Sequence, residues 1–430
     1  MAKAIIIAAP SSGSGKTLIT LGLIRAFKNR GVKVTSAKIG PDYIDGRFHE
    51  AASGCTCINL DYWAMGASAC AARLAEIGTG QDLIIIEGVM GLFDGPGGAR
   101  GSTADLSETL GLPILFVIDA ARQAQSIAAT VHGFTSFRPN LNFAGLILNR
   151  VASDRHMSLL VRALAKSTPP ILGALRQNDS YHLPSRHLGL VQAMENQELE
   201  SFIETVASGV TRETILDKIY ESASDFTNQT TNDNFILDPF AQNIAIARDE
   251  AFAFCYPHFL SDWRKAGAEL TFFSPLNNDA PKGDAVFLPG GYPELHAGKL
   301  AANTKFLDAL RQHKGLIYGE CGGYMVLGDG LIDKDGIKHA MAGLLPVTTN
   351  FAARKLQLGY RQLIPLNGPF KTTLRGHEFH YSTIESQGKG KAKAAALFNA
   401  QDAAGNNLGS MGQCVGNVMG SYAHIISEAP

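Results

Sequence analysis

The sequence lacks an excess of charge of either sign, since its 430 residues carry 38 basic and 39 acidic side chains and a formal net charge of −1. That balance gives no electrostatic basis for binding nucleic acid or an anionic membrane. The sequence also lacks an apolar run long enough to cross a bilayer. We therefore expect partners that are neither nucleic acid nor membrane.

The cysteines have no spacing typical of a disulfide framework, and Cys55-Thr56-Cys57 has no second pair to complete a zinc site. The amino-terminal stretch MAKAIIIAAPSSGSGKT contains only a short apolar core, too short for a secretory signal. We therefore expect a reduced, cytoplasmic protein. The six cysteines are Cys55, Cys57, Cys70, Cys255, Cys321 and Cys414.

Small apolar residues and glycine are plentiful, which suits an α/β protein with parallel strands and many tight loops. In the first half, short continuous apolar runs alternate with a helical pattern, and this order predicts βαβ units and a parallel sheet. The segment 16–31 has helical spacing and stops at Gly31, a suitable helix end. Buried strands are predicted at residues 3–10, 32–40, 82–91, 113–120 and 143–151.

A polar segment near residues 221–242 interrupts this pattern, because it is rich in Ser, Thr, Asn and Asp and has no periodicity. We interpret 226–242 as a linker between an amino-terminal domain, 1–225, and a carboxy-terminal domain, 243–430. The stretch from 340 to 430 mixes short strand-like runs with glycines. In the second domain, apolar strands are predicted at residues 243–249, 268–275, 284–291 and 315–321.

The segment APSSGSGKT follows the first predicted strand and opens the first predicted helix, which is the context of a phosphate-binding P-loop. Pro10 stands where that pattern usually begins with glycine. Backbone N–H groups and the helix amino terminus would face a phosphate, and Lys16 would neutralise its oxygens. The Thr17 hydroxyl would bind magnesium. The predicted ATP-binding residues of this loop are Gly13, Ser14, Gly15, Lys16 and Thr17.

Acidic residues follow the next two strands, in the segments KIGPDYIDGRFH and IIIEGVMGLFDG. Loops that leave the carboxyl ends of parallel strands converge on one crevice, so these acids should meet the P-loop there. Lys38, in the first segment, is a further predicted ATP-binding residue. Asn149 ends a later strand and suits either a hydrogen bond to an adenine edge or a plain turn. The four acids are Asp42, Asp45, Glu87 and Asp94.

The segment YGECGGYMVLG places Cys321 in a G-x-C-x-G pattern between an apolar strand and a helix-like run. This is the cysteine version of a nucleophile elbow. We expect the helix amino terminus to lower the pKa of the thiol. His424 is the predicted base, with His377 and His380 as rivals. A second glycine turn, at Gly290 and Gly291, could supply an oxyanion hole; the site residues are then Cys321, His424, Gly290 and Gly291.

These two sites complement each other chemically. A thiol with a base can release ammonia from the carboxamide of glutamine through a thioester. A nucleotide site can phosphorylate a carboxylate, and ammonia can attack the resulting acyl phosphate. The product of the two reactions together is a new carboxamide.

The motifs SSGSGKT, AKIGPDYIDGRFH, NLDYWAM, IEGVMGLFDG, LPGGYPELHAG, GECGGYMVLG and RGHEFHYS occur in the order found in one family. Over essentially its whole length the chain resembles the a,c-diamide synthases of corrinoid biosynthesis. Its first half is similar to dethiobiotin synthetase-type P-loop proteins, and its second half resembles the class I glutamine amidotransferase domain. The resemblance implies ATP- and glutamine-dependent amidation of the a- and c-acetate side chains of a corrin ring.

The resemblance also implies residue roles. Cys321 and His424 match the glutaminase nucleophile and base. Thr17, Asp42 and Glu87 match the magnesium site, and the remaining candidates, Tyr43, Asp45 and Asp94, match residues that bind the corrinoid. Class I amidotransferases generally carry a glutamate two residues after the histidine; because Ile426 occupies that place, we expect a Cys-His pair without a third member.

Several alternatives stay open at this point. The segments NLDYWAM and ARDEAFAFCYPHFLSDWRKAGAEL most resemble the branch that acts on hydrogenobyrinic acid, before cobalt insertion. Cobyrinic acid, which carries cobalt, is the second candidate and a nickel sirohydrochlorin the third. Two further hypotheses are a synthase that amidates other corrin carboxylates and a nucleotide-switch or partitioning ATPase. A homodimer is implied only by the resemblance.

Overall fold

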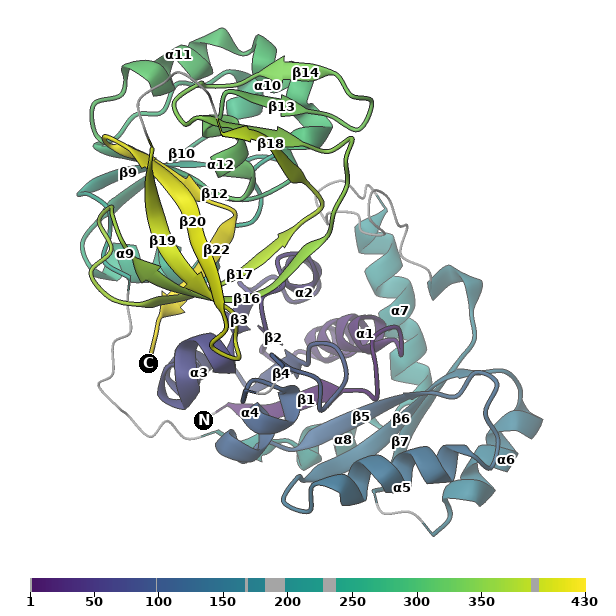
Figure 1. The fold of residues 1–430 in the computed structure, drawn as a ribbon. Helices are drawn as coiled ribbons and strands as arrows, with labels where there is room; N and C mark the ends of the chain where they lie inside the picture. The colour runs from purple at the N-terminus through teal and green to yellow at the C-terminus, as the bar shows by residue number, and fades with distance from the viewer. Residues whose placement is uncertain (1, 98, 167–168, 182–197, 227–236, 388–393) are drawn as a thin grey trace. The chain divides into compact units, whose positions relative to one another are not determined.

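The computed structural model describes residues 2–97, 99–166, 169–181, 198–226, 237–387 and 394–430. The chain divides into two compact units (Figure 1). The first consists of Met1–Gly95 and Arg100–Asp233, and the second of Asn234–Pro430 together with Pro96–Ala99. Of the predicted linker, residues 227–236 lie outside the described residues.

The first unit is built on a sheet in the order β3-β2-β4-β1-β5-β6-β7, in which all neighbours are parallel. β8 pairs antiparallel with β1. The continuous apolar strands arise because helices cover both faces of such a sheet. All five strands predicted in this half are confirmed, as β1 (Lys3–Ala8), β2 (Val34–Ile39), β4 (Leu83–Glu87), β5 (Ile114–Asp119) and β6 (Phe143–Val151); the others are β3 (Ile58–Leu60), β7 (Ile171–Arg176) and β8 (Ser224–Asp225).

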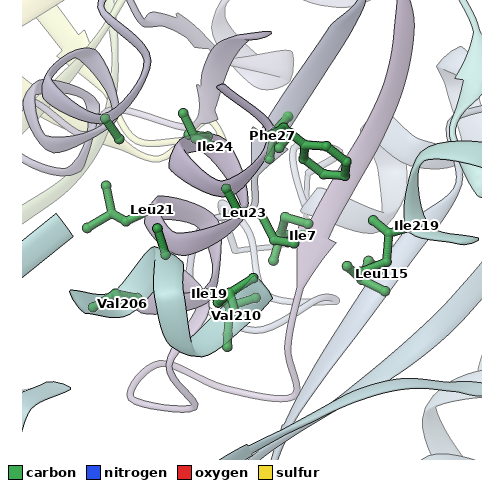
Figure 2. Close-up of a cluster of buried hydrophobic side chains, with 14 of the residues drawn as sticks. Ile7, Ile19, Leu21, Leu23, Ile24, Phe27, Leu115, Val206, Val210 and Ile219 are labelled. Carbon is green, nitrogen blue, oxygen red and sulfur yellow. The ribbon is translucent and has the colours of Figure 1, made fainter. Parts of the chain in front are cut away.

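The predicted first helix is confirmed as α1 (Lys16–Asn29). It packs on α7, which comes from the end of the unit, and apolar side chains of both helices form one core with the sheet (Figure 2). Arg25 of α1 also donates to Glu200 at 2.5 Å and to Glu204 at 2.6 Å on α7. The other helices are α2 (Asp45–Ser53), α3 (Tyr62–Gly78), α4 (Thr103–Leu110), α5 (Ile127–Phe137), α6 (Asp154–Leu164), the 3-10 turn η1 (Asp179–Tyr181), α7 (Leu199–Glu213) and α8 (Leu216–Ser222).

The second unit has a large mixed sheet in the order β10-β9-β11-β12-β21-β20-β19-β16-β17-β22. Its first five strands are parallel and the rest antiparallel. The four strands predicted here are confirmed as β9 (Asn243–Ala247), β10 (Glu269–Phe273), β11 (Ala285–Leu288) and β12 (Leu316–Glu320). The antiparallel part consists of β16 (Gln357–Pro365), β17 (Leu374–His380), β19 (Ala395–Gln401), β20 (Asn407–Val415) and β22 (Ala423–Glu428), and is joined to the parallel part by β21 (Val418–Ser421).

A smaller sheet, in the order β14-β13-β15-β18, completes the second unit. The predicted α/β fold class is thus confirmed. In the part of the chain that the structure describes, no helix combines the length and apolarity needed to cross a membrane. The remaining elements are β13 (Gly330–Ile332), β14 (Lys338–Ala340), β15 (Val347–Asn350), β18 (Thr383–Gln387), α9 (Pro257–Lys265), η4 (Pro275–Asn277), η5 (Pro293–His296), α10 (Ala297–Ala302), α11 (Thr304–Gln312) and α12 (Gly322–Leu327).

Candidate active sites

The predicted P-loop joins β1 to α1. Gly15 has a φ of 97°, and a Cβ built there would lie only 2.1 Å from Nδ2 of Asn149, so this position requires glycine. The same Nδ2 donates to the carbonyl of Ser14 at 3.0 Å. In this structure the Asn149 amide therefore stabilises the P-loop through its contact with Ser14. Its predicted contact with adenine stays a prediction.

Lys16 is buried and faces into the loop. Its Nζ donates to the carbonyl of Ser11 at 3.4 Å and to the carbonyl of Met90, in the loop after β4. Burial lowers the pKa of Lys16, and the neighbouring Lys38 works in the same direction, whereas Glu87 opposes it. Phosphate oxygens can replace such carbonyl acceptors, because a charged acceptor makes a stronger hydrogen bond with an ammonium.

Three side-chain oxygens meet beside the start of α1. The hydroxyl of Thr17 lies 2.7 Å from Oε1 of Glu87 and 3.3 Å from Oδ2 of Asp45. Glu87 ends β4, and Asp45 begins α2 after β2, so neighbouring parallel strands deliver both carboxylates to one edge of the sheet. The predicted convergence of these groups on the P-loop is therefore what the backbone topology produces.

Lys38, at the end of β2, lies among the same acids. Its Nζ donates to Asp45 at 2.6 Å and to Glu87 at 2.8 Å, and lies 3.7 Å from Oδ2 of Asp42. Burial disfavours the charge on Lys38, but the carboxylates together hold its pKa well above the ordinary value. Burial, followed by repulsion from Asp42, raises the pKa of Asp45 to about 6.

Sequence reasoning did not identify His49, which lies behind Glu87. Its Nε2 is 2.6 Å from Oε2 of Glu87, and its Nδ1 is 3.5 Å from the sulfur of Cys57. Burial disfavours the imidazolium, but contacts with Cys57 and Glu87 raise the pKa of His49 to about 10. Burial likewise disfavours the Glu87 carboxylate, yet Lys38 and His49 hold its pKa well below the usual range. No local pattern marks a histidine on α2 for this role.

These oxygens suit magnesium, a hard cation with oxygen ligands. Adjacent ligands of an octahedral magnesium ion are about 3 Å apart, since each bond is about 2.1 Å long. The separations of Thr17 from Glu87 and Asp45, 2.7 and 3.3 Å, agree with that spacing. Within the described residues, no group of three or more His, Cys, Asp and Glu side chains could hold a metal ion.

The remaining acids have different surroundings. Oδ1 of Asp42 accepts the backbone N–H groups of Ile44 and Asp45, both at 2.9 Å, and so shapes the turn that begins α2. Tyr43 is half-buried in the same turn. Asp94 is exposed, and its Oδ2 accepts the N–H of Gly91 at 2.9 Å.

In the second unit, Cys321 occupies a strained turn between β12 and α12. Its φ of 44° and ψ of −102° are unusual for a residue with a side chain, and they are typical of a nucleophile elbow. Its N–H donates to the carbonyl of Ser421 at 2.8 Å, which ties the elbow to β21. The sulfur lies 4.0 Å from the carbonyl oxygen of Phe379.

The predicted base and the predicted oxyanion turn are adjacent. A Cβ built at Gly290 would lie 2.2 Å from Cε1 of His424, so the imidazole packs directly on that backbone. A Cβ built at Gly322, the residue after Cys321, would lie 3.1 Å from the N of Gly291. The structure thus brings the glycine turn together with both the imidazole and the elbow.

The protonation states differ from the sequence-based expectation. Burial, reinforced by Glu294 and Glu378, raises the pKa of the Cys321 thiol and outweighs the lowering by the backbone N–H of Gly322 at the start of α12, so the expected net lowering is wrong. The helix concerned, α12, has only six residues. Burial also lowers the pKa of His424 to about 3. The resting pair is therefore a neutral thiol and a neutral imidazole.

The rival histidines lie on β17, beside the strand that carries His424. His377 pairs with His424 across the two strands. His380 is held by Glu378 at 2.9 Å and by Ser382 at 2.8 Å, and its ring stacks on Tyr422. His380 thus belongs to a separate hydrogen-bonded network.

A match to the nucleotide binding domain described as CobQ/CobB/MinD/ParA covers residues 5–191, and a match to the CobB/CobQ-like glutamine amidotransferase domain covers residues 243–430. The hydrogenobyrinate a,c-diamide synthase of Brucella anthropi is 49% identical over 438 residues, covering 99% of this chain and 98% of that protein. The enzymes of the same name from Sinorhizobium sp and Rhizobium meliloti are each 48% identical, covering 99% and 98% of this chain and 99% and 98% of their own lengths.

The fold and these matches define a P-loop nucleotide-binding unit joined to a glutamine amidotransferase unit in one chain. Within that class, the chain belongs to the hydrogenobyrinate a,c-diamide synthase family. The alternative of a nucleotide-switch or partitioning ATPase is thereby set aside, because it has no amidotransferase unit.

Proposed function

We propose that this chain is a glutamine-hydrolysing ligase that amidates the a- and c-acetate carboxylates of hydrogenobyrinic acid in cobalamin biosynthesis, using ATP and glutamine. The identity of 49% across 99% of the chain is the observation that supports this most strongly. The residues at both sites supply the groups that such a reaction needs. We assign residues 1–225 to amide synthesis and residues 243–430 to glutamine hydrolysis.

Glutamine hydrolysis begins at Cys321. His424 takes the thiol proton as the sulfur attacks the carboxamide carbon, and the N–H groups of Gly290 and Gly291 stabilise the oxyanion. The imidazolium then returns its proton to the leaving nitrogen, so that ammonia departs and a thioester remains. Water hydrolyses the thioester to glutamate and restores the thiol. Neutral resting partners mean that the proton moves only when substrate is present.

Amide synthesis takes place in the P-loop unit. A corrinoid carboxylate attacks the γ-phosphorus of ATP, which forms an acyl phosphate and ADP. Ammonia then displaces phosphate from the acyl carbon and leaves the carboxamide. Lys16 and the backbone N–H groups of Gly13, Ser14 and Gly15 stabilise the phosphate oxygens. We assign Tyr43 and Asp94 to the corrinoid, since Asp94 is exposed beside the loop.

Magnesium, when bound, neutralises charge on the nucleotide phosphates. We assign its protein ligands to Thr17, Glu87 and Asp45, with Asp45 in place of the predicted Asp42. The reason is that Asp45 approaches the Thr17 hydroxyl, whereas Asp42 Oδ1 accepts two backbone N–H groups. Lys38 then balances the charge of these carboxylates and remains near the γ-phosphate.

The test of this function has two parts. Glutamate release from glutamine should require Cys321, so equal release by the wild-type protein and by Cys321→Ala would disprove the glutaminase assignment. With ATP, glutamine and hydrogenobyrinic acid, the product should lose about one mass unit for each carboxylate converted to an amide, as formula arithmetic for the step requires. A product with two such changes is expected.

Substrate choice is tested by comparing hydrogenobyrinic acid with cobyrinic acid under identical conditions. We expect a higher kcat/KM with the cobalt-free substrate, and no reaction with a corrin already amidated at both positions. A preference for the cobalt form would transfer the same chemistry to cobyrinic acid. We include in the proposal a homodimer and a cytoplasmic location, which light scattering and cell fractionation test.

A further inference from the structure

A buried carboxylate lies behind the base of the glutaminase site. Glu320 is the last residue of β12 and directly precedes Cys321. Its Oε2 lies 4.0 Å from Nδ1 of His424, and the exposed fractions of these two side chains are 3% and 2%. Hydrogen bonds of catalytic groups are often long before substrate binds, so this separation is compatible with a contact that closes during the reaction.

The orientation of Glu320 is fixed independently of the histidine. Oε1 accepts the backbone N–H of Ile425 at 3.0 Å, which leaves Oε2 directed toward the imidazole. Glu320 on β12 and His424 on β22 are 104 positions apart in the chain. The nucleophile and this carboxylate are therefore adjacent in the sequence, whereas the base reaches both from a different strand.

Two other positions come into question as an acid for His424, namely residue 426 and Glu378. Residue 426 follows His424 by two positions on β22 and so shares its face of the strand, but it is an isoleucine. Glu378 is buried nearby and opposes the lowering of the His424 pKa, but its oxygens accept hydrogen bonds from Arg361 at 2.8 Å and from His380 at 2.9 Å. Glu320 has an oxygen that faces the imidazole.

We propose that Glu320 is a positioning residue that accepts the Nδ1–H of His424 and thereby keeps Nε2 free to take the Cys321 proton. This inference rests on the proposed glutaminase function. Fixing the proton on Nδ1 selects the tautomer in which the other ring nitrogen is basic. As the thiol transfers its proton, the imidazole becomes an imidazolium, and the adjacent carboxylate stabilises that charge. The catalytic group of the glutaminase then has three members, and its acid, Glu320, comes from β12, the strand that precedes Cys321.

The ionised form of Glu320 is the stronger acceptor for Nδ1–H and the form that stabilises the imidazolium. Burial raises the pKa of Glu320 to about 8, against the effect of hydrogen bonds from the Ile425 N–H and Tyr318. The titratable groups facing it are Tyr318 on β12, Cys321 at the end of that strand, and His424 on β22. Glutamine hydrolysis should therefore increase as the pH rises from 7 to 9.

The decisive comparison is Glu320→Gln against Glu320→Ala. Glutamine retains an oxygen for the Ile425 N–H but presents an amide to Nδ1, whereas alanine removes both contacts. We expect Glu320→Gln to lower kcat for glutamate release on the order of 100-fold, with KM little changed. It should also abolish the rise between pH 7 and 9. Glu428→Gln, the same substitution at the end of β22, serves as the matched control.

A purely structural role predicts a different pattern, in which Glu320→Gln keeps the wild-type kcat and pH profile and only Glu320→Ala is impaired; that result would overturn the inference. Melting temperature and amide synthesis from added ammonium chloride establish that each variant is folded. If Glu320→Gln does not fold, Glu320→Asp is decisive instead, because its carboxylate should preserve the pH-dependent rise. Loss of that rise in folded Glu320→Asp would equally overturn the inference. Absence of glutaminase activity in the wild-type protein would instead refute the proposed function.

Discussion

Nε2 of His49 lies 2.6 Å from Oε2 of Glu87, and both side chains are buried. This contact leaves Oε1 of Glu87 to face Thr17 and Lys38. An imidazolium in this place does two things, because it neutralises a buried carboxylate and fixes its rotation. The orientation of an acid beside the nucleotide therefore depends on a residue that faces away from the nucleotide.

His49→Gln should reduce amide synthesis because Glu87 loses its charged partner. A neutral amide still donates one hydrogen bond, so the fold is retained while the carboxylate is held less firmly. We expect a loss of about 10- to 100-fold in kcat with ammonium chloride as nitrogen source. The measurement is carried out in parallel with His132→Gln, at an exposed position of α5, which should behave as wild type. Equal rates for the two variants would contradict the assigned role.

Lys16→Ala should abolish amide synthesis while leaving glutaminase activity intact. The lysine supplies charge to phosphate oxygens, and loss of one such group reduces phosphoryl transfer on the order of 100-fold or more. Amide product and glutamate are measured in the same samples. Lys28→Ala, at the exposed end of the same helix, is the control. Loss of both activities from folded Lys16→Ala would show that the two reactions are tightly coupled.

Gly290→Ala should disable glutamine hydrolysis selectively. The added methyl group would take the place of His424 Cε1, 2.2 Å away, so the imidazole must move. We expect kcat for glutamate release to fall on the order of 100-fold, while ammonium-driven synthesis persists. Gly298→Ala is the control, because the nearest atom there, on His339, is 3.6 Å from the new carbon. An active Gly290→Ala would mean that the imidazole position is not critical.

Because His424 is buried and neutral, the free energy of unfolding should decrease as the pH falls below 6.5. Its pKa is lowered from 6.5 to about 3, so between those values the unfolded chain binds a proton that the folded chain does not. Stability is then present in full above pH 6.5 and is lost as the pH falls toward 3, by at most about 1.4 kcal/mol per pH unit. Melting curves of wild type and His424→Gln should therefore converge or cross between pH 6 and 4. Parallel behaviour would contradict a neutral buried histidine.

Much of this architecture could be predicted because short, contiguous sequence patterns determine it. The strands β1, β2 and β4 are continuous apolar runs, and parallel strands bring their carboxyl ends to one edge. Lys38, Asp45 and Glu87 could therefore be placed together from sequence. The glycine pattern around Cys321 likewise indicated the elbow, since a sharp turn between a strand and a helix needs small neighbours.

The rest depended on distances that no local pattern encodes. Glu320 was overlooked because its relation to His424 joins two strands that are far apart in sequence. His49 was overlooked because its partners, Cys57 and Glu87, are positioned by other elements. The pKa of Cys321 was predicted in the wrong direction because burial, which a sequence does not report, outweighs the influence of one short helix.

The packing of α1 against α7 has a consequence for folding during translation, because α7 is translated long after α1. Val206 and Val210 cover α1 (Figure 2), and β8 pairs with β1 only at residues 224 and 225. The match to the nucleotide-binding domain ends at residue 191. A nascent chain that ends there lacks α7 and would leave the apolar face of α1 exposed. We therefore expect β1 and α1 to complete their packing only after α7 and β8 have been translated. Expression fragments of this unit should extend beyond residue 225.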